Sequence, residues 1–150
     1  GLSGAALKPF ARLLDGVDLS PGMIAEAGRR AIYDHLEIDE AFRFLDRTDR
    51  QWNVIAAVDM LNYIGDLGPV LAAAGRRLRP GGLVVGTVEK CDMGVALTEK
   101  RRYAHGADHV AEAAATAGLA VLELSEGTLR REGGAPVAGL VFALEKPLFA

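Results

Sequence analysis

The chain has 150 residues, half of them hydrophobic and a quarter charged, and a formal net charge of −3 at pH 7. This length and composition predict one globular domain over residues 1–150 with a core of its own. The acidic balance argues against nucleic-acid binding by charge, which needs a basic face. The apolar runs are interrupted well before the ~20 residues of a membrane helix, so no membrane partner is expected. The single cysteine, Cys91, cannot form an internal disulfide, and the expected compartment is the cytoplasm.

Apolar, β-rich runs alternate with helical segments along the chain. The predicted strands cover residues 16–19, 35–39, 53–58, 83–89, 120–125 and 137–146, and the predicted helices cover residues 3–14, 21–30, 67–78 and 107–117. Pro9 divides the first helix into two pieces, and Ser20 followed by Pro21 is a typical helix start. Strands that alternate with helices predict an α/β fold with a doubly wound, parallel sheet.

Two segments refine this sheet. Residues 54–58 are all apolar without alternation, which predicts a central strand covered on both faces. Near the end, residues 123–131 and 137–146 flank a turn at Gly133 and Gly134, which predicts a hairpin. Because a hairpin is antiparallel, the predicted sheet is mostly parallel with one reversed strand at its end.

A single carboxylate, Asp18, ends the first apolar run, in the segment LLDGVDLSPGMI. Ligands of doubly wound sheets bind beyond the carboxyl ends of the strands. An acid there, roughly 20 residues after a glycine-rich turn, accepts hydrogen bonds from ribose hydroxyls. Gly1 and Gly4 precede Asp18 by about that interval. Helix capping by Asp18 is the alternative, although Ser20 already offers a cap. We therefore predict a nucleoside ligand at Asp18.

The chain resembles the class I S-adenosylmethionine-dependent methyltransferases over nearly all of its length. The matching segments are GLSG, GVDLSPGMI, WNVIAAVDMLNYIGDL, RRLRPGGLVVGTVE and the terminal hairpin. Within that family, DMLNYIGDL and RRYAHGADHV are similar to a bacterial small-molecule branch that includes methyltransferases attached to tetratricopeptide repeats. The resemblance implies a Rossmann-like methyltransferase sheet, S-adenosyl-L-methionine as cofactor and a small-molecule acceptor.

The resemblance also assigns roles around the nucleoside. Gly1 corresponds to the last glycine of the cofactor loop, where the backbone approaches the methionyl part closely. Asp18 corresponds to the ribose-binding acid, and Leu19 lines the adenine slot. Met23 covers the adenine, with simple core packing as the alternative role.

Further along the chain, Glu40 with Ala41 corresponds to the segment that touches the adenine amino group. Asp39 is an alternative for that acid, one residue away. Asp59 opens the segment Asp59-Met60-Leu61, which corresponds to the region beneath the sulfonium that faces the acceptor.

Two side chains are candidates for catalysis at the acceptor. Tyr63 follows a predicted central strand, where an aromatic ring covers a pocket or packs under the loop. His105 precedes a helix and is a candidate base, with a cap or a solvated side chain as the alternatives. His105 and His109 have the spacing of a helical zinc pair, but no third ligand is evident, so no metal is expected. Arg130 and Arg131 either attract an anionic acceptor or form a solvated edge.

The start of the chain departs from the family pattern, which begins with a strand and an acid-x-G-x-G-x-G run. Gly1 aligns with the final glycine of that run, so we expect an N-terminally truncated domain without the family's first strand. Strands that lose their partner also make a dimer by strand exchange conceivable. Two other functions stay open: an inactive methyltransferase-like binding or scaffold module, and a nicotinamide-dependent oxidoreductase. The terminal hairpin counts against the oxidoreductase.

Overall fold

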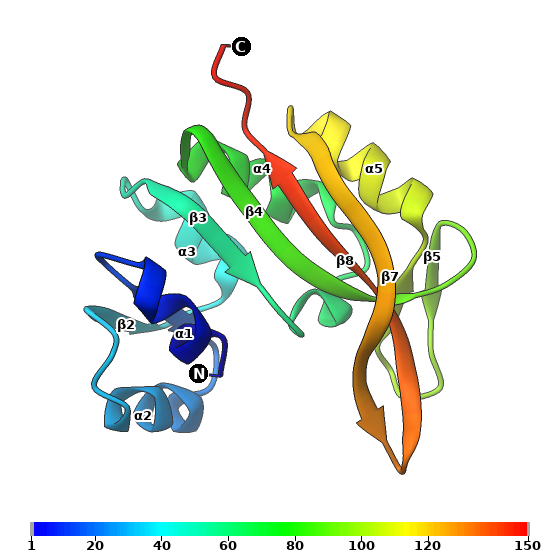
Figure 1. Ribbon diagram of the computed structural model, residues 1–150, viewed down its shortest axis with the longest axis horizontal. Helices are drawn as coiled ribbons and strands as arrows, with labels where there is room; N and C mark the ends of the chain where they lie inside the picture. The colour runs from blue at the N-terminus through cyan, green and yellow to red at the C-terminus, as the bar shows by residue number, and fades with distance from the viewer. Residues whose placement is uncertain (1, 150) are drawn as a thin grey trace. The chain divides into compact units, whose positions relative to one another are not determined.

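The computed structural model describes residues 2–149 (Figure 1), which fall into one unit ending at Thr48 and another beginning at Asp49. The first unit contains α1 (Leu2–Leu7), the 3-10 turn η1 (Lys8–Phe10), β1 (Asp15–Asp18), α2 (Pro21–Arg29), β2 (His35–Ile38) and α3 (Ala41–Arg47). None of the described helices has the length and apolar character needed to cross a membrane.

In the first unit, a parallel pair of strands is joined by α2. β1 and β2 run in register from Asp15 opposite His35 to Asp18 opposite Ile38. The connecting helix begins where the sequence predicts it, because the Ser20 hydroxyl accepts the Met23 N–H at 3.3 Å. The predicted division of the first helix at Pro9 is confirmed, because the α-helix ends at Leu7 and Pro9 lies in η1. The predicted extent is wrong, since residues 11–14 are not helical.

The second unit is built on a six-stranded sheet. Its elements are β3 (Trp52–Ala57), η2 (Leu61–Tyr63), α4 (Gly68–Arg77), β4 (Leu78–Lys90), β5 (Val95–Leu97), β6 (Tyr103–His105), α5 (Ala107–Thr116), β7 (Ala120–Glu132) and β8 (Ala135–Glu145). β3 and β6 run parallel to β4, whereas β8 is antiparallel to both β4 and β7. The terminal hairpin is confirmed, and positive φ angles at Gly133 and Gly134 form its turn. The sequence did not predict α3, β5 or β6, which are short.

One face of this sheet carries the core of the second unit. Figure 1 shows α4 and α5 behind the sheet. The buried side chains come from β4, β8 and these two helices: Leu71, Val84, Val88, Val110, Ala114, Leu140, Phe142 and Leu144. Alternation along β4 and β8 directs these residues to the same side. The two helices therefore cover a single face.

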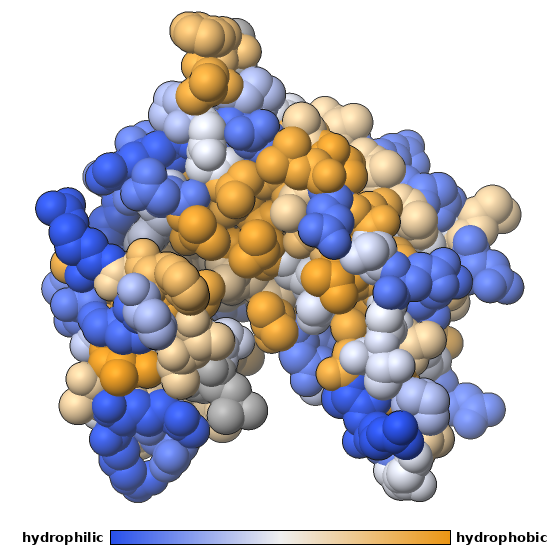
Figure 2. Space-filling model, viewed as in Figure 1, coloured by the Kyte–Doolittle hydropathy of each residue, from blue (hydrophilic) through white to orange (hydrophobic). Residues whose placement is uncertain are grey.

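The opposite face of the sheet is exposed, which contradicts the prediction that β3 is a central strand covered on both faces. Val54 and Val58 are 44% and 47% exposed, and Val141 on β8 is 42% exposed. Figure 2 shows an apolar surface over β4 and β8 on this side. β3 was predicted as a central strand, but among the described strands it pairs only with β4, and β1 pairs only with β2. Both therefore keep one edge without a strand partner in the described part of the chain.

Candidate functional site

Asp18 lies at the carboxyl end of β1, and its carboxylate has one oxygen engaged. Oδ1 accepts the backbone N–H of Ser20 at 2.8 Å, which ties the turn that precedes α2. The N-cap of α2 is made by Ser20 itself. Oδ2 of Asp18 has no hydrogen-bond partner within residues 2–149. One oxygen thus shapes the turn, and the other is available to a ligand.

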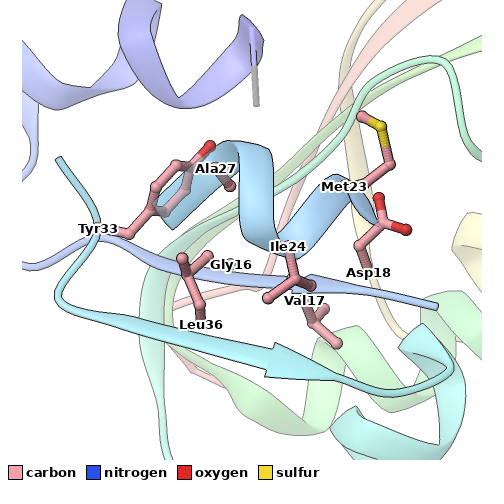
Figure 3. Close-up of a pocket in the computed structure, with 8 residues that line it drawn as sticks. All are labelled: Gly16, Val17, Asp18, Met23, Ile24, Ala27, Tyr33 and Leu36. Carbon is pink, nitrogen blue, oxygen red and sulfur yellow. The ribbon is translucent and has the colours of Figure 1, made fainter. Parts of the chain in front are cut away.

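Apolar side chains surround this carboxylate and are unusually exposed. Leu19 is 68% exposed, Met23 46% and Ile38, the register partner of Asp18 on β2, 53%. In Figure 3, Met23 and Asp18 lie at the same end of a pocket whose other end is formed by Tyr33 and Leu36. The pocket holds only about 50 Å³, well below the ~300 Å³ of ligand pockets. This pocket is too small to enclose a nucleoside.

The two acids at the end of β2 are engaged in the fold. Asp39 is 4% exposed, and its carboxylate accepts the Nε–H groups of Arg43 at 2.6 Å and Arg47 at 2.9 Å. Glu40 caps α3, accepting the N–H groups of Phe42 and Arg43. Ala41 is the first residue of α3.

In the second unit, Asp59 follows β3 with a left-handed backbone, φ +56°. A non-glycine residue there is uncommon and costs of order 1 kcal/mol, and such residues cluster at functional sites. Two tethers hold the residue: its N–H donates to the Thr87 hydroxyl at 2.9 Å, and Arg130 Nη1 donates to its Oδ1 at 2.6 Å. Asp59 is thus fixed at the carboxyl end of a parallel strand.

Arg130 belongs to an ion cluster that the sequence did not predict. Its members are Asp59, Glu89, Lys100, Arg102, Arg130 and Glu132. Hydrogen bonds from Lys100, Arg130 and Arg102 lower the pKa of Glu132 to about 2. Because the cluster engages Arg130 with three carboxylates, this arginine is no free anchor for an anionic acceptor. No local signal could have found the cluster, since Arg130 and its partner Asp59 lie 71 residues apart in the sequence.

The two predicted catalytic side chains differ in access. Tyr63 in η2 is 68% exposed. His105 in β6 is fully buried, and its ring stacks on that of His109 with centroids 5.2 Å apart. Burial, and then the charge of His109, lower the pKa of His105 to about 4, so the ring is neutral at pH 7. The backbone groups of Ile64 and Leu61 oppose this shift, although within the described residues no ring nitrogen of His105 forms a hydrogen bond of normal geometry.

The complete burial of His105 limits its ability to act as a base. A base has to reach the proton it removes within hydrogen-bond distance, and this ring is not accessible from solvent. Its role as a base stays a prediction. Asn62, beside Tyr63, is likewise buried at 3% exposure, and its Oδ1 has no hydrogen-bond partner in the part of the chain that the structure describes. Gly1 lies outside the described residues, and within those residues no group of three His, Cys, Asp or Glu side chains could hold a metal ion.

Comparison with known proteins shows the family to which this chain is similar. A family model described as "Methyltransferase domain" matches residues 1–86. The ubiquinone biosynthesis O-methyltransferase of Bradyrhizobium sp. (strain ORS 278) is 31% identical over 88 residues, which cover 55% of this chain and 35% of that protein. The chain therefore spans about a third of the length of this curated relative.

Two solved structures show the same fold. The N-methyltransferase NodS from Bradyrhizobium japonicum WM9, in complex with S-adenosyl-l-homocysteine, has a TM-score of 0.70 at 20% identity and covers 97% of this chain and 74% of its own. An S-adenosylmethionine-dependent methyltransferase from Clostridium acetobutylicum ATCC 824 has a TM-score of 0.73 at 14% identity and covers 95% and 78%. Since the family model matches more than half of the sequence, the chain belongs to the methyltransferase domain family of class I S-adenosylmethionine-dependent methyltransferases.

Proposed function

We propose that this domain transfers a methyl group from S-adenosylmethionine to a small-molecule acceptor. The observation that carries the proposal is the Asp18 carboxylate at the end of β1, which keeps one oxygen without a partner among the described residues and has exposed Leu19 and Met23 beside it. A carboxylate that accepts hydrogen bonds from the ribose hydroxyls, next to apolar side chains that contact the adenine, is a combination suited to an adenosine group. The residues present fit this cofactor.

The proposal gives each nucleoside contact to a residue of the first unit. Asp18 Oδ2 accepts a ribose hydroxyl, and Leu19 and Met23 contact the adenine. The side chains of Asp39 and Glu40 already serve ion pairs and the α3 cap, so we assign the adenine contact at Glu40 and Ala41 to the backbone. Gly1 is kept as the glycine near the methionyl part.

At the acceptor, the proposal relies on orientation. S-adenosylmethionine supplies a methyl group already activated by its sulfonium, so the protein chiefly holds the acceptor in line. We assign Asp59 to the sulfonium side and the exposed Tyr63 to contact with the acceptor. We keep His105 as the candidate base, although its ring is fully buried. The curated relative is named an O-methyltransferase and NodS an N-methyltransferase, which supports a small-molecule acceptor without choosing its atom.

The test is calorimetric titration with S-adenosylhomocysteine. Wild-type protein and Glu26→Gln, a control in an exposed acid of α2, should bind equally. Asp18→Asn should weaken binding about tenfold or more, because a hydrogen bond to a charged group contributes roughly 1.5–3 kcal/mol. Wild-type affinity in Asp18→Asn, or binding of NAD instead of S-adenosylhomocysteine, would overturn the proposal.

The lone Cys91 supports the cytoplasm as the proposed compartment.

A further inference from the structure

The guanidinium of Arg130, on β7, joins three carboxylates from distant parts of the second unit. Nη1 donates to Asp59 Oδ1 at 2.6 Å, Nε donates to Glu132 Oε1 at 2.7 Å, and Nη2 donates to Glu89. Asp59 follows β3, whereas Glu89 lies on β4. One side chain of the terminal hairpin thereby connects the carboxyl ends of two parallel strands.

The carboxylates that bind Arg130 are themselves bound by Arg102. The Glu89 side chain is only 9% exposed and also accepts Arg102 Nε at 2.6 Å. Arg102 Nη2 donates in turn to Glu132 at 2.8 Å. A guanidinium fork bound by several carboxylates has a fixed plane and direction. Arg130 is therefore held by Glu89 and Glu132 in addition to its contact with Asp59.

Asp59 has the most exposed side chain of the three partners of Arg130, at 52%. Its left-handed backbone is uncommon for a residue other than glycine, although aspartate adopts it more readily than most residues. The Thr87 hydroxyl fixes the backbone N–H, and among residues 2–149 only Arg130 binds the carboxylate. Without Arg130 the carboxylate could rotate into solvent.

We propose that Arg130 is the positioning residue of Asp59, so that the β7–β8 hairpin sets where the Asp59 carboxylate acts on the cofactor. This inference rests on the proposed function, in which Asp59 faces the sulfonium. The carboxylate then favours a positive charge on the cofactor sulfur, and its effect depends on being held in one place.

The ratio of the affinities for the two forms of the cofactor distinguishes a positioning role from a merely structural one. S-adenosylmethionine carries a positive charge on sulfur and S-adenosylhomocysteine does not, while the rest of the molecule is shared. A general loss of structure weakens both ligands alike. Loss of a placed carboxylate lowers the affinity for the charged form relative to the neutral one.

The experiment is a double-mutant cycle on the ratio of the two dissociation constants, measured by calorimetry on the full chain. Asp59→Asn should reduce the preference for S-adenosylmethionine about fivefold, the effect of ~1 kcal/mol expected of a half-exposed charge pair. In an Arg130→Lys background, which keeps the charge but loses the fork, Asp59→Asn should change the ratio by less than about twofold. Independent sites would instead give equal effects in both backgrounds.

Arg131→Lys is the matched control, because the neighbouring Arg131 is exposed and donates to the Gly134 carbonyl at the hairpin turn. Asp59→Asn should keep its full effect there. If Arg130→Lys does not fold, Glu132→Gln removes the charge of the acceptor of Arg130 Nε and takes its place in the cycle. An equal effect of Asp59→Asn with and without Arg130, or no effect on the ratio in the wild type, would overturn the inference. Failure of both ligands to bind wild-type protein would instead overturn the proposed function.

Discussion

Acidification should destabilise the second unit through His105. The ring is fully buried and its pKa is lowered from 6.5 to about 4, first by burial and then by the charge of His109. Between pH 4 and pH 6.5, His105 binds a proton in the unfolded chain but not in the folded protein. Stability is therefore present above pH 6.5 and is lost as the pH falls toward 4. From pH 7 to pH 5, the expected loss is about 2 kcal/mol, a large fraction of a typical stability of roughly 5–15 kcal/mol.

Urea unfolding at pH 7 and pH 5, followed by fluorescence of the single tryptophan, Trp52, measures this loss in the unit that contains His105. His105→Gln should be less stable at both pH values but should lose about 2 kcal/mol less than wild type between them. His35→Gln, at an exposed histidine of β2, is the control and should behave like the wild type. An equal pH dependence in wild type and His105→Gln would refute the argument that burial holds this ring neutral.

Three further predictions concern local features of the fold. Glu132→Gln should lower the free energy of unfolding at pH 7. Because the pKa of Glu132 is lowered from 4.5 to about 2, the difference from wild type should shrink as the pH falls from 4.5 toward 2, as urea titrations at each pH can check. Gly86→Ala should cost about 1–3 kcal/mol, because the added methyl meets Phe142 Cε2 at 2.9 Å and the Ala57 carbonyl at 3.1 Å. Gly127→Ala, with no neighbour within 4 Å, should be close to neutral in the same denaturation assay. Ser20→Ala removes the N-cap of α2 and should cost about 1 kcal/mol by circular dichroism melting; no change would mean that Asp18 alone holds this turn.

The sequence by itself determined features that depend on neighbouring residues. Ser20 and Pro21 start α2 because a hydroxyl cap and a fixed φ act within one helical turn. Gly133 and Gly134 close the terminal hairpin because they adopt positive φ without strain. The lone acid at Asp18 was likewise predicted at a strand end, where the structure has it. Each of these signals is complete within a few residues.

The tertiary structure decided which side chains meet. Strand register brings Arg130 to Asp59 across 71 residues. The fold also buries His105 beside His109 of α5, although the sequence predicted a candidate base with a cap or a solvated side chain as the alternatives. Val54 is exposed because it lies on the sheet face opposite α4 and α5, although the run of apolar residues predicted burial on both faces. Caps and turns are fixed by local backbone geometry, whereas burial and ion pairing depend on neighbours that only the folded chain supplies.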